Sequence, residues 1–142
     1  YFGGKDWLKY YRDLYREDAE GWRRAVDNIE RLRRFTQDNG VLLLIVNYPE
    51  LHHLEIYPFA GVERKIRAAA QERGIPYLDL LGSIPHKSPE RLWVSPTDAH
   101  PNAFANGLYA RATRKKLLEV LGQGRSGMMK TGRPADRVTG ID

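Results

Sequence analysis

Two residues that are able to move a proton, Asp98 and His100, stand two positions apart in the segment 94–102. Side chains at i and i+2 of an extended chain point to the same side, so the Asp98 carboxylate can lie beside the His100 imidazole and fix its tautomer. Together they would form the base and the orienting group of a nucleophilic triad. The same short motif also occurs as a surface pair beside a helix cap, so the surrounding elements have to decide between the two interpretations.

The residues after His100 predict how this pair is held. Pro101 has a fixed φ that suits the first turn of a helix, and Asn102 can hold the loop by local hydrogen bonds. The helix is predicted to end at Gly122 or Gly124. Its apolar face is formed by Phe104, Leu108, Ala112, Leu117, Leu118 and Leu121.

The chain before this segment predicts alternating helices and strands. One amphipathic helix stops at Asn39-Gly40, and a second stops at Gly74. The continuous apolar run 41–46 is typical of a parallel strand that is covered on both faces, and the next strand is expected over 75–80. The apolar stripes of the two helices are formed by Trp22, Val26, Ile29, Leu32 and Phe35, and by Val62, Ile66, Ala69 and Ala70.

This order of strand, crossover helix and strand is a right-handed βαβ unit, so the fold class is expected to be α/β. Two parallel strands are few for such a sheet, and at least one strand edge should lack a partner. A loop rich in proline and serine, 82–101, follows the second strand. It brings Asp98 and His100 to the carboxyl end of the sheet, where open α/β folds bind ligands.

The block 98–102 (Asp-Ala-His-Pro-Asn), the helix after it and the strand 75–80 resemble the C-terminal block of SGNH/GDSL-family hydrolases. The resemblance covers about residues 20–121, because other features recur in the same order in bacterial members: Trp22 through the strand 41–46, Tyr57-Pro58-Phe59 before a helix, and Gly74-Ile75 before Asp79-Leu80-Leu81. It implies a flavodoxin-like three-layer α/β/α fold with parallel strands. It also implies a serine-type esterase in which His100 is the general base and Asp98 its orienting carboxylate.

The family's signatures for the nucleophile and the oxyanion hole, Gly-Asp-Ser and Gly-x-Asn-Asp, do not occur in this sequence. The histidine motif is one residue shorter than the common Asp-x-x-His, which puts Thr97 at the common aspartate position. The chain also begins at Tyr1 without a methionine, like a cut chain. We therefore expect residues 1–122 to be the C-terminal part of such a hydrolase, to supply the Asp98 and His100 half of its triad, and to be inactive alone.

The resemblance implies an ester-bearing small molecule or an acylated glycan as the substrate, and it implies no cofactor. Three alternatives stay open. The protein could be a glycan O-acyltransferase of the same fold, or a non-catalytic α/β interaction module in which Asp98 and His100 are structural. It could also be a binder of nucleic acid or another anionic polymer that acts through the basic residues of 111–142.

Other polar residues have weaker claims to chemistry. Asn47 is interpreted as a strand-end turn rather than an oxyanion asparagine. Ser95 lacks a strand-to-helix elbow and is interpreted as a loop serine, while Asp79 fits either a turn or a cleft. A metal site is not expected, because no ligand set at a known spacing is complete. The side chains considered for it, which fit the rim of a cleft, are His52, His53, His86, Glu50 and Glu55.

Composition excludes several classes of protein. The 142 residues contain zero cysteines, so disulfides, Cys-ligated zinc and a thiol nucleophile are excluded. No apolar stretch reaches the roughly 18 residues of a membrane span. The net charge of +5 lies in 111–142, where no aromatic residues interleave with a run of bases, so we expect a solvated helix face and no specific nucleic acid. Residues 123–142 are predicted to be a disordered basic tail.

Overall fold

The computed structural model describes residues 6–130, and side chains through residue 122. It contains four α-helices and four short strands within these residues. They are α1 (Trp7–Leu14), α2 (Glu20–Asp38), β1 (Ile45–Asn47), α3 (Ala60–Gln71), β2 (Tyr77–Asp79), β3 (Trp93–Ser95), β4 (Asp98–Pro101) and α4 (Ala103–Lys130), with short 3-10 turns at Leu81–Ser83 and Pro89–Leu92.

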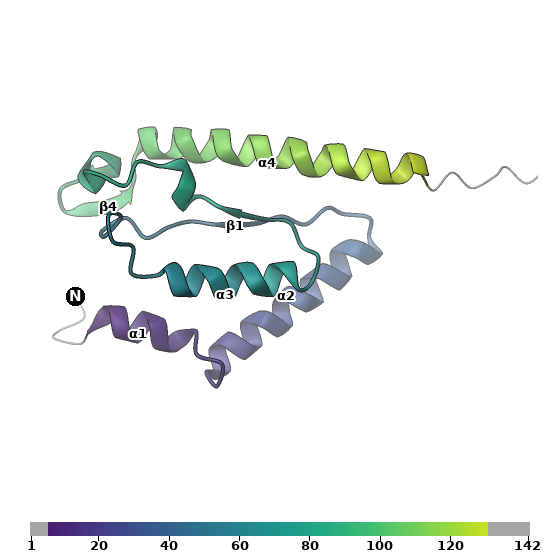
Figure 1. Ribbon diagram of the computed structural model, residues 1–142, viewed down its shortest axis with the longest axis horizontal. Coiled ribbons are helices and arrows are strands. Elements are labelled where there is room, and N and C mark those ends of the chain that lie inside the picture. The colour runs from purple at the N-terminus through teal and green to yellow at the C-terminus, as the bar shows by residue number, and fades with distance from the viewer. Residues whose placement is uncertain (1–5, 131–142) are drawn as a thin grey trace, which may run out of the picture.

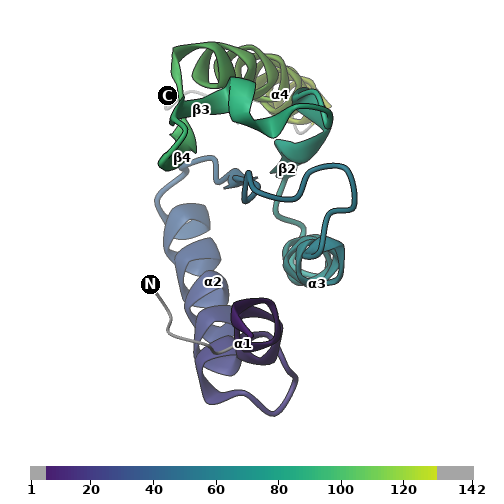
Figure 2. The ribbon, with the colours of Figure 1, turned by 90° about the vertical axis from the view of Figure 1, so that its left-hand side faces the viewer.

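A small parallel sheet lies at the centre of the molecule. Strand β1 pairs with β2, and α3 is the crossover between them; Asn47 and Asp79, the last residues of the two strands, are register partners. Helix α4 lies on one side of this sheet and α3 on the other (Figure 1), and the view turned by 90° has the same layering (Figure 2). The protein is therefore a mixed α/β structure with parallel strands, as the sequence predicts.

Glycines end α2 and α3 at the predicted places. Gly40 has φ 66° and Gly74 has φ 64°, a left-handed conformation that a residue with a Cβ rarely adopts. In both turns the amide after the glycine donates to the carbonyl five residues back, at 2.8 and 2.9 Å (Val41 to Thr36 and Ile75 to Ala70). The segments that lead into β1 and β2 thus begin with the same kind of turn.

The main core lies between α4 and the carboxyl ends of the parallel strands. Each buried leucine in it contributes about 1.5 to 3 kcal/mol relative to an exposed one. The core connects the chain after β1, the chain after β2 and the first turns of α4, so it fixes the part of the molecule that carries the candidate site. Its members are Leu51, Leu54, Leu80, Ile84, Leu92, Ala105 and Tyr109.

The strand predicted over 41–46 differs from the observed one. Only Ile45–Asn47 pairs with β2, and Val41 and Leu42 are 55% and 56% exposed, because nothing among residues 6–122 covers them. The apolar stripe of α2 is also only partly covered, since Phe35 is 64% exposed. The predicted coverage is therefore wrong at Val41, Leu42 and Phe35 within the described part of the chain, and the exposure of Val41 and Leu42 agrees with the expected strand edge that lacks a partner.

Three segments have more regular structure than predicted. Helix α1 has no counterpart in the sequence prediction, and the 82–101 loop contains two short strands, β3 and β4. Helix α4 continues through Gly122 and Gly124 to Lys130, although glycine inside a helix costs about 1 kcal/mol relative to alanine. The rest of the predicted tail, 131–142, lies outside the described residues. None of the helices in residues 6–130 is long and apolar enough to cross a membrane.

Candidate functional site

A two-stranded antiparallel hairpin carries Asp98 and His100. Trp93 is the register partner of Pro101, and Ser95 is the partner of Asp98. The Trp93 indole N–H donates to the carbonyl of Leu51 at 3.2 Å, which attaches the hairpin to the core. The hairpin enters α4 directly, so the predicted base stands immediately before a helix.

The structure brings Asp98 and His100 together as predicted. Asp98 Oδ1 accepts the backbone N–H of His100 at 3.0 Å and lies 2.5 Å from its Nδ1. The hydrogen bond from the His100 backbone, followed by that from its ring, lowers the pKa of Asp98. The His100 side chain is 86% exposed, and its Nε2 forms no hydrogen bond within the described residues. The carboxylate thus holds one ring nitrogen and leaves the other open to solvent.

Asn102 joins the hairpin to α4, as its predicted role in holding the loop requires. Its Nδ2 donates to the carbonyls of Arg91 and Trp93 at 2.9 and 3.1 Å, and its Oδ1 accepts the amide of Ala105 at 3.0 Å. Its backbone N–H donates to the Leu92 carbonyl at 2.8 Å. A capping side chain of this kind stabilises a helix by about 1 kcal/mol.

No serine hydroxyl forms a hydrogen bond with His100 in the part of the chain that the structure describes. Ser83 Oγ donates to the Leu80 carbonyl at 2.7 Å, and Ser95 Oγ lies 3.3 Å from Thr97 Oγ1. These hydroxyls are therefore engaged locally.

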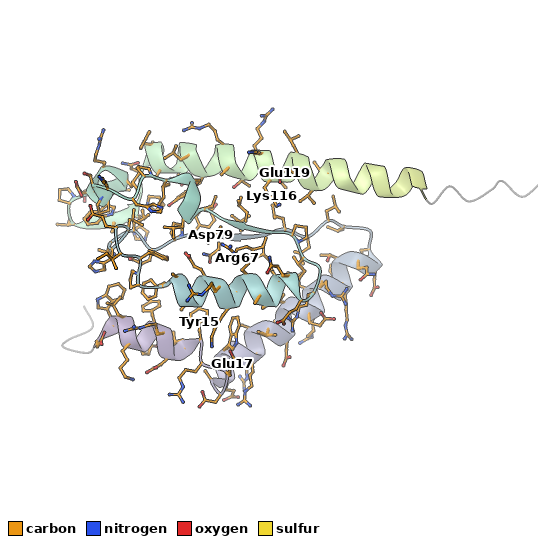
Figure 3. The ribbon with its side chains drawn as sticks, in the orientation of Figure 1. Tyr15, Glu17, Arg67, Asp79, Lys116 and Glu119 are labelled. Carbon is orange, nitrogen blue, oxygen red and sulfur yellow. The ribbon has the colours of Figure 1, made fainter. Side chains whose placement is uncertain are left out.

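A second polar cluster lies at the carboxyl end of the parallel sheet. Glu63 on α3 is only 6% exposed, and Asn47 Nδ2 donates to its Oε1 at 3.4 Å. Asp79 accepts the Leu81 amide at 2.9 Å and the Arg67 guanidinium at 3.0 Å. Figure 3 shows Arg67 and Asp79 extending toward one another from α3 and β2. Helix α3 and the end of β2 thus bring the carboxyl groups of Glu63 and Asp79 close together.

The pKa of Glu63 is raised to about 7, mainly by burial and in addition by the nearby charge of Asp79. A charged carboxylate loses hydration when it is buried, and a second negative charge beside it adds repulsion. The Tyr57 hydroxyl hydrogen-bonds to Glu63 and favours its charged form. Burial also raises the pKa of Tyr57 above its usual range, and it raises that of Tyr77 to about 12. Glu63 can therefore gain or lose a proton near neutral pH.

A groove of about 810 Å³ opens next to this cluster. Glu63, Asn47 and Glu50 are among its polar lining residues. Most of the remaining wall is aromatic or apolar, and it includes Trp7, Tyr11, Tyr57, Phe59, Val62 and Ile66. The groove combines a large apolar surface with a few polar groups, as small-molecule sites do.

The histidines considered for a metal site occupy different surroundings. His52 Nδ1 contacts the Glu50 carboxylate, and the His53 ring stacks on Trp7 with centroids 6.0 Å apart. His86 Nε2 lies 3.1 Å from the Leu81 carbonyl. Among residues 6–130 no three histidine, aspartate or glutamate side chains gather closely enough to hold a metal ion. His52 and His53 line the groove described above, as expected for a cleft rim, whereas His86 does not line it.

Glu63 is the residue that sequence analysis missed. It lies one helical turn after Phe59 and seven residues before Ala70, so it occupies the buried stripe of α3. A glutamate on an apolar helix face was the available signal, because such a residue is almost never buried without partners. Its partners Asn47 and Asp79 were noted separately as strand-end residues.

Comparison of the chain with protein-family models, with curated proteins and with solved structures gave no match.

Proposed function

We propose that this chain supplies the acid/base half of a serine-type acyl-transfer site, in which His100 is the general base and Asp98 its orienting carboxylate. The reaction is ester hydrolysis, and the substrate is an ester-bearing small molecule or an acylated glycan. The nucleophilic serine and the oxyanion hole would come from residues outside this chain.

The geometry of the Asp98 and His100 pair is the observation that carries the proposal. In a nucleophilic triad the carboxylate binds Nδ1 of the imidazole, and Nε2 faces the nucleophile. Asp98 binds Nδ1 here, and Nε2 of a largely exposed ring is free of hydrogen bonds within residues 6–122. The backbone contact from His100 to the same carboxylate oxygen fixes the pair further.

The proposed reaction proceeds in two steps. His100 Nε2 takes the proton of the serine hydroxyl while the serine oxygen bonds to the ester carbonyl carbon, and His100 then returns that proton to the departing alcohol. Water next attacks the acyl-serine with the same base, which releases the acid and the free serine. Asp98 stabilises the imidazolium in both steps without accepting its proton.

The fold that accompanies this proposal is a flavodoxin-like three-layer α/β/α sheet, to which β1 and β2 would contribute two neighbouring strands. The hairpin delivers His100 after β2, on the side of the molecule to which both parallel strands run. Ligands of open α/β folds bind at that end of the sheet.

The first experiment treats the 142-residue chain with a serine-directed fluorophosphonate and locates adducts by mass spectrometry. We expect no stoichiometric adduct and no hydrolysis of aryl esters above a denatured control, because no described serine is hydrogen-bonded to His100. A single adduct at Ser83 or Ser95 that disappears in His100→Ala would overturn the assignment of the nucleophile to another segment.

The second experiment reads the coding sequence upstream of Tyr1. A Gly-Asp-Ser segment directly after an apolar strand is expected, and a polypeptide that joins it to this chain should hydrolyse aryl esters. Transfer of the acyl group to an added sugar in place of water would assign the site to a glycan O-acyltransferase. If no such segment precedes the chain, the proposed acyl transfer is wrong, and the non-catalytic interaction module is the favoured alternative.

A further inference from the structure

One edge of the parallel sheet is open and lies between two helices. The sheet has two strands, and no strand among residues 6–130 pairs with β2 on the side away from β1. A second groove, of about 660 Å³, follows this open edge, and we call it the edge groove. Residues 75–79 line it, and the labelled side chains of Arg67, Lys116 and Glu119 lie in the space between α3 and α4 (Figure 3). Its walls consist of Arg67 and Gln71 from α3, Ala112, Lys115, Lys116 and Glu119 from α4, and Gly82 and Ser83 from the turn after β2.

The register of the parallel pair decides which backbone groups face the edge groove. The Pro76 carbonyl accepts an N–H from β1, and the Leu80 N–H donates to a carbonyl of β1, both at 3.0 Å. Successive residues of a strand direct their N–H and C=O groups to opposite edges, so those of Tyr77 and Asp79 face the groove. Residues 77–79 contain no proline, lysine or bulge, which are the devices that prevent an edge from pairing. The backbone of β2 is therefore ready to accept another strand.

The charges of the edge groove favour an acidic partner. Its lining contains three basic and two acidic side chains. Asp79 lies 3.0 Å from Arg67, and Glu119 lies 3.3 Å from Lys116, while Lys115 forms no ion pair within the described residues. Both pairs are partly exposed to water, and such pairs are weak, so their bases remain able to bind another carboxylate. One positive charge is left over, and it lies on the α4 wall.

We propose that the open edge of β2 binds an extended acidic segment of another protein as an added strand. The backbone of the segment forms hydrogen bonds with Tyr77 and Asp79, and its alternate side chains point to the α4 wall, where Lys115 and Lys116 meet its carboxylates. The inference involves neither Asp98 nor His100, so it is independent of the proposed acyl transfer.

The test titrates the 142-residue chain with a capped hexapeptide of alternating glutamate and threonine, and calorimetry follows the binding. We expect saturable binding with a Kd of about 1 mM or below, and at least about tenfold weaker binding when lysines replace the glutamates of the peptide. No saturable binding of the acidic peptide, or equal affinity for the two peptides, overturns the proposal.

Two N-methylated isomers of the acidic peptide distinguish an added strand from general charge attraction. One isomer carries methyl groups on the backbone nitrogens of its glutamates, and the other carries them on those of its threonines. Only one of the two sets directs its backbone toward β2, so one isomer should bind at least about tenfold more weakly while the other stays within about threefold of the unmodified peptide. Equal affinities of the two isomers overturn strand addition.

Hydrogen exchange locates the added strand. Binding of the acidic peptide should slow exchange of the Tyr77 and Asp79 amide protons, whereas that of Leu80, which is already bonded to β1, should change little. If the first two amides are as protected as that of Leu80 before the peptide is added, residues 131–142 or a second copy of the chain occupies the edge, and the proposal is wrong.

Matched variants test the charge contact. Lys115→Gln should weaken binding of the acidic peptide about threefold, and Lys115→Arg, which keeps the charge, should restore it. Arg114→Gln removes the same charge from the neighbouring residue, which lines a different groove, and should leave the affinity within about twofold of the original. Circular dichroism checks that each variant folds. Equal effects of Lys115→Gln and Arg114→Gln in folded proteins overturn the assigned contact.

Discussion

Asp98 and Glu63 are carboxyl groups that each form a hydrogen bond to a titratable neighbour, yet their surroundings move their pKa values in opposite directions. Asp98 stands in an exposed hairpin and accepts two N–H groups from His100, so its charged form is favoured. Glu63 is 6% exposed and faces Asp79, so its neutral form is favoured. A carboxyl group beside a donor at the surface is an anion at neutral pH, whereas one that is buried beside a second carboxyl group keeps its proton to a higher pH.

The two sites therefore suit different tasks. Asp98 keeps its charge over the whole physiological range, which an orienting carboxylate requires. Glu63 changes charge near pH 7, which couples the groove and the free energy of unfolding to pH.

The largest effect is expected from the exposed pair. In a polypeptide that contains the complete proposed site, His100→Ala should lower esterase turnover about 10³-fold or more, because the base is lost. Asp98→Asn should lower it substantially but less completely, because the base remains and only its tautomer and charge are affected. Steady-state kinetics on an aryl ester measures both, and near-normal turnover of His100→Ala would show that the pair is structural.

The second effect concerns the buried cluster. The folded-state pKa of Glu63, about 7, lies above its ordinary value of 4.5, so the folded protein binds more protons than the unfolded chain between these values. The free energy of unfolding should therefore fall by about 2 to 3 kcal/mol between pH 5 and pH 8 through this group. Glu63→Gln should remove that dependence and be the more stable protein at pH 8. Urea unfolding at both pH values checks this, and parallel profiles for the two proteins would contradict it.

A smaller effect is expected when the cation next to the buried cluster is removed. Arg67 lies 3.0 Å from Asp79 and lowers the pKa of Glu63, so Arg67→Gln should move the midpoint of the pH dependence upward by a fraction of a pH unit. Arg67→Lys keeps the charge and should leave the midpoint near its original position. The same urea series measures this midpoint. A downward shift for Arg67→Gln would show that Arg67 raises the pKa of Glu63 instead of lowering it.

The smallest effect is expected from the stability contribution of Asp98. Its lowered pKa stabilises the folded state above the ordinary value of 3.8, and this contribution is lost as the pH falls through the folded-state pKa. Because the pair is exposed, Asp98→Asn should change thermal stability only slightly at pH 7. A large loss of stability in this variant would mean that the hairpin depends on the pair, and that its role is structural.

The sequence predicted the exposed site better than the buried one, for a physical reason. Asp98, His100 and Asn102 interact within a few residues, so the spacing alone indicates their contacts. The helices that end at Gly40 and Gly74, and the parallel pairing of the strands after them, were predicted for the same reason. A glycine that ends a helix in a left-handed turn is recognised from the few residues around it, so this pattern is local.

Long-range contacts were the part that could not be predicted. Glu63 meets Asn47 and Asp79 only after α3 packs on the sheet, and none of the three predicts the others by its spacing. The apolar run 41–46 depends on a long-range contact in a different way. Its composition indicates burial, yet Val41 and Leu42 stay exposed, because burial depends on a neighbour and no described segment provides one.

The hydrogen bonds of Asn102 have a consequence for the local opening of the fold. One side chain bonds to Arg91 and Trp93 on the hairpin side and to Ala105 in the first turn of α4. The hairpin and that turn therefore form one cooperative unit, in which neither part opens while the other stays closed. Ala105 is fully buried in the main core, so this unit is anchored there. The amide proton of Ala105, which is donated to Asn102 Oδ1, should therefore exchange with solvent only when the hairpin opens as well.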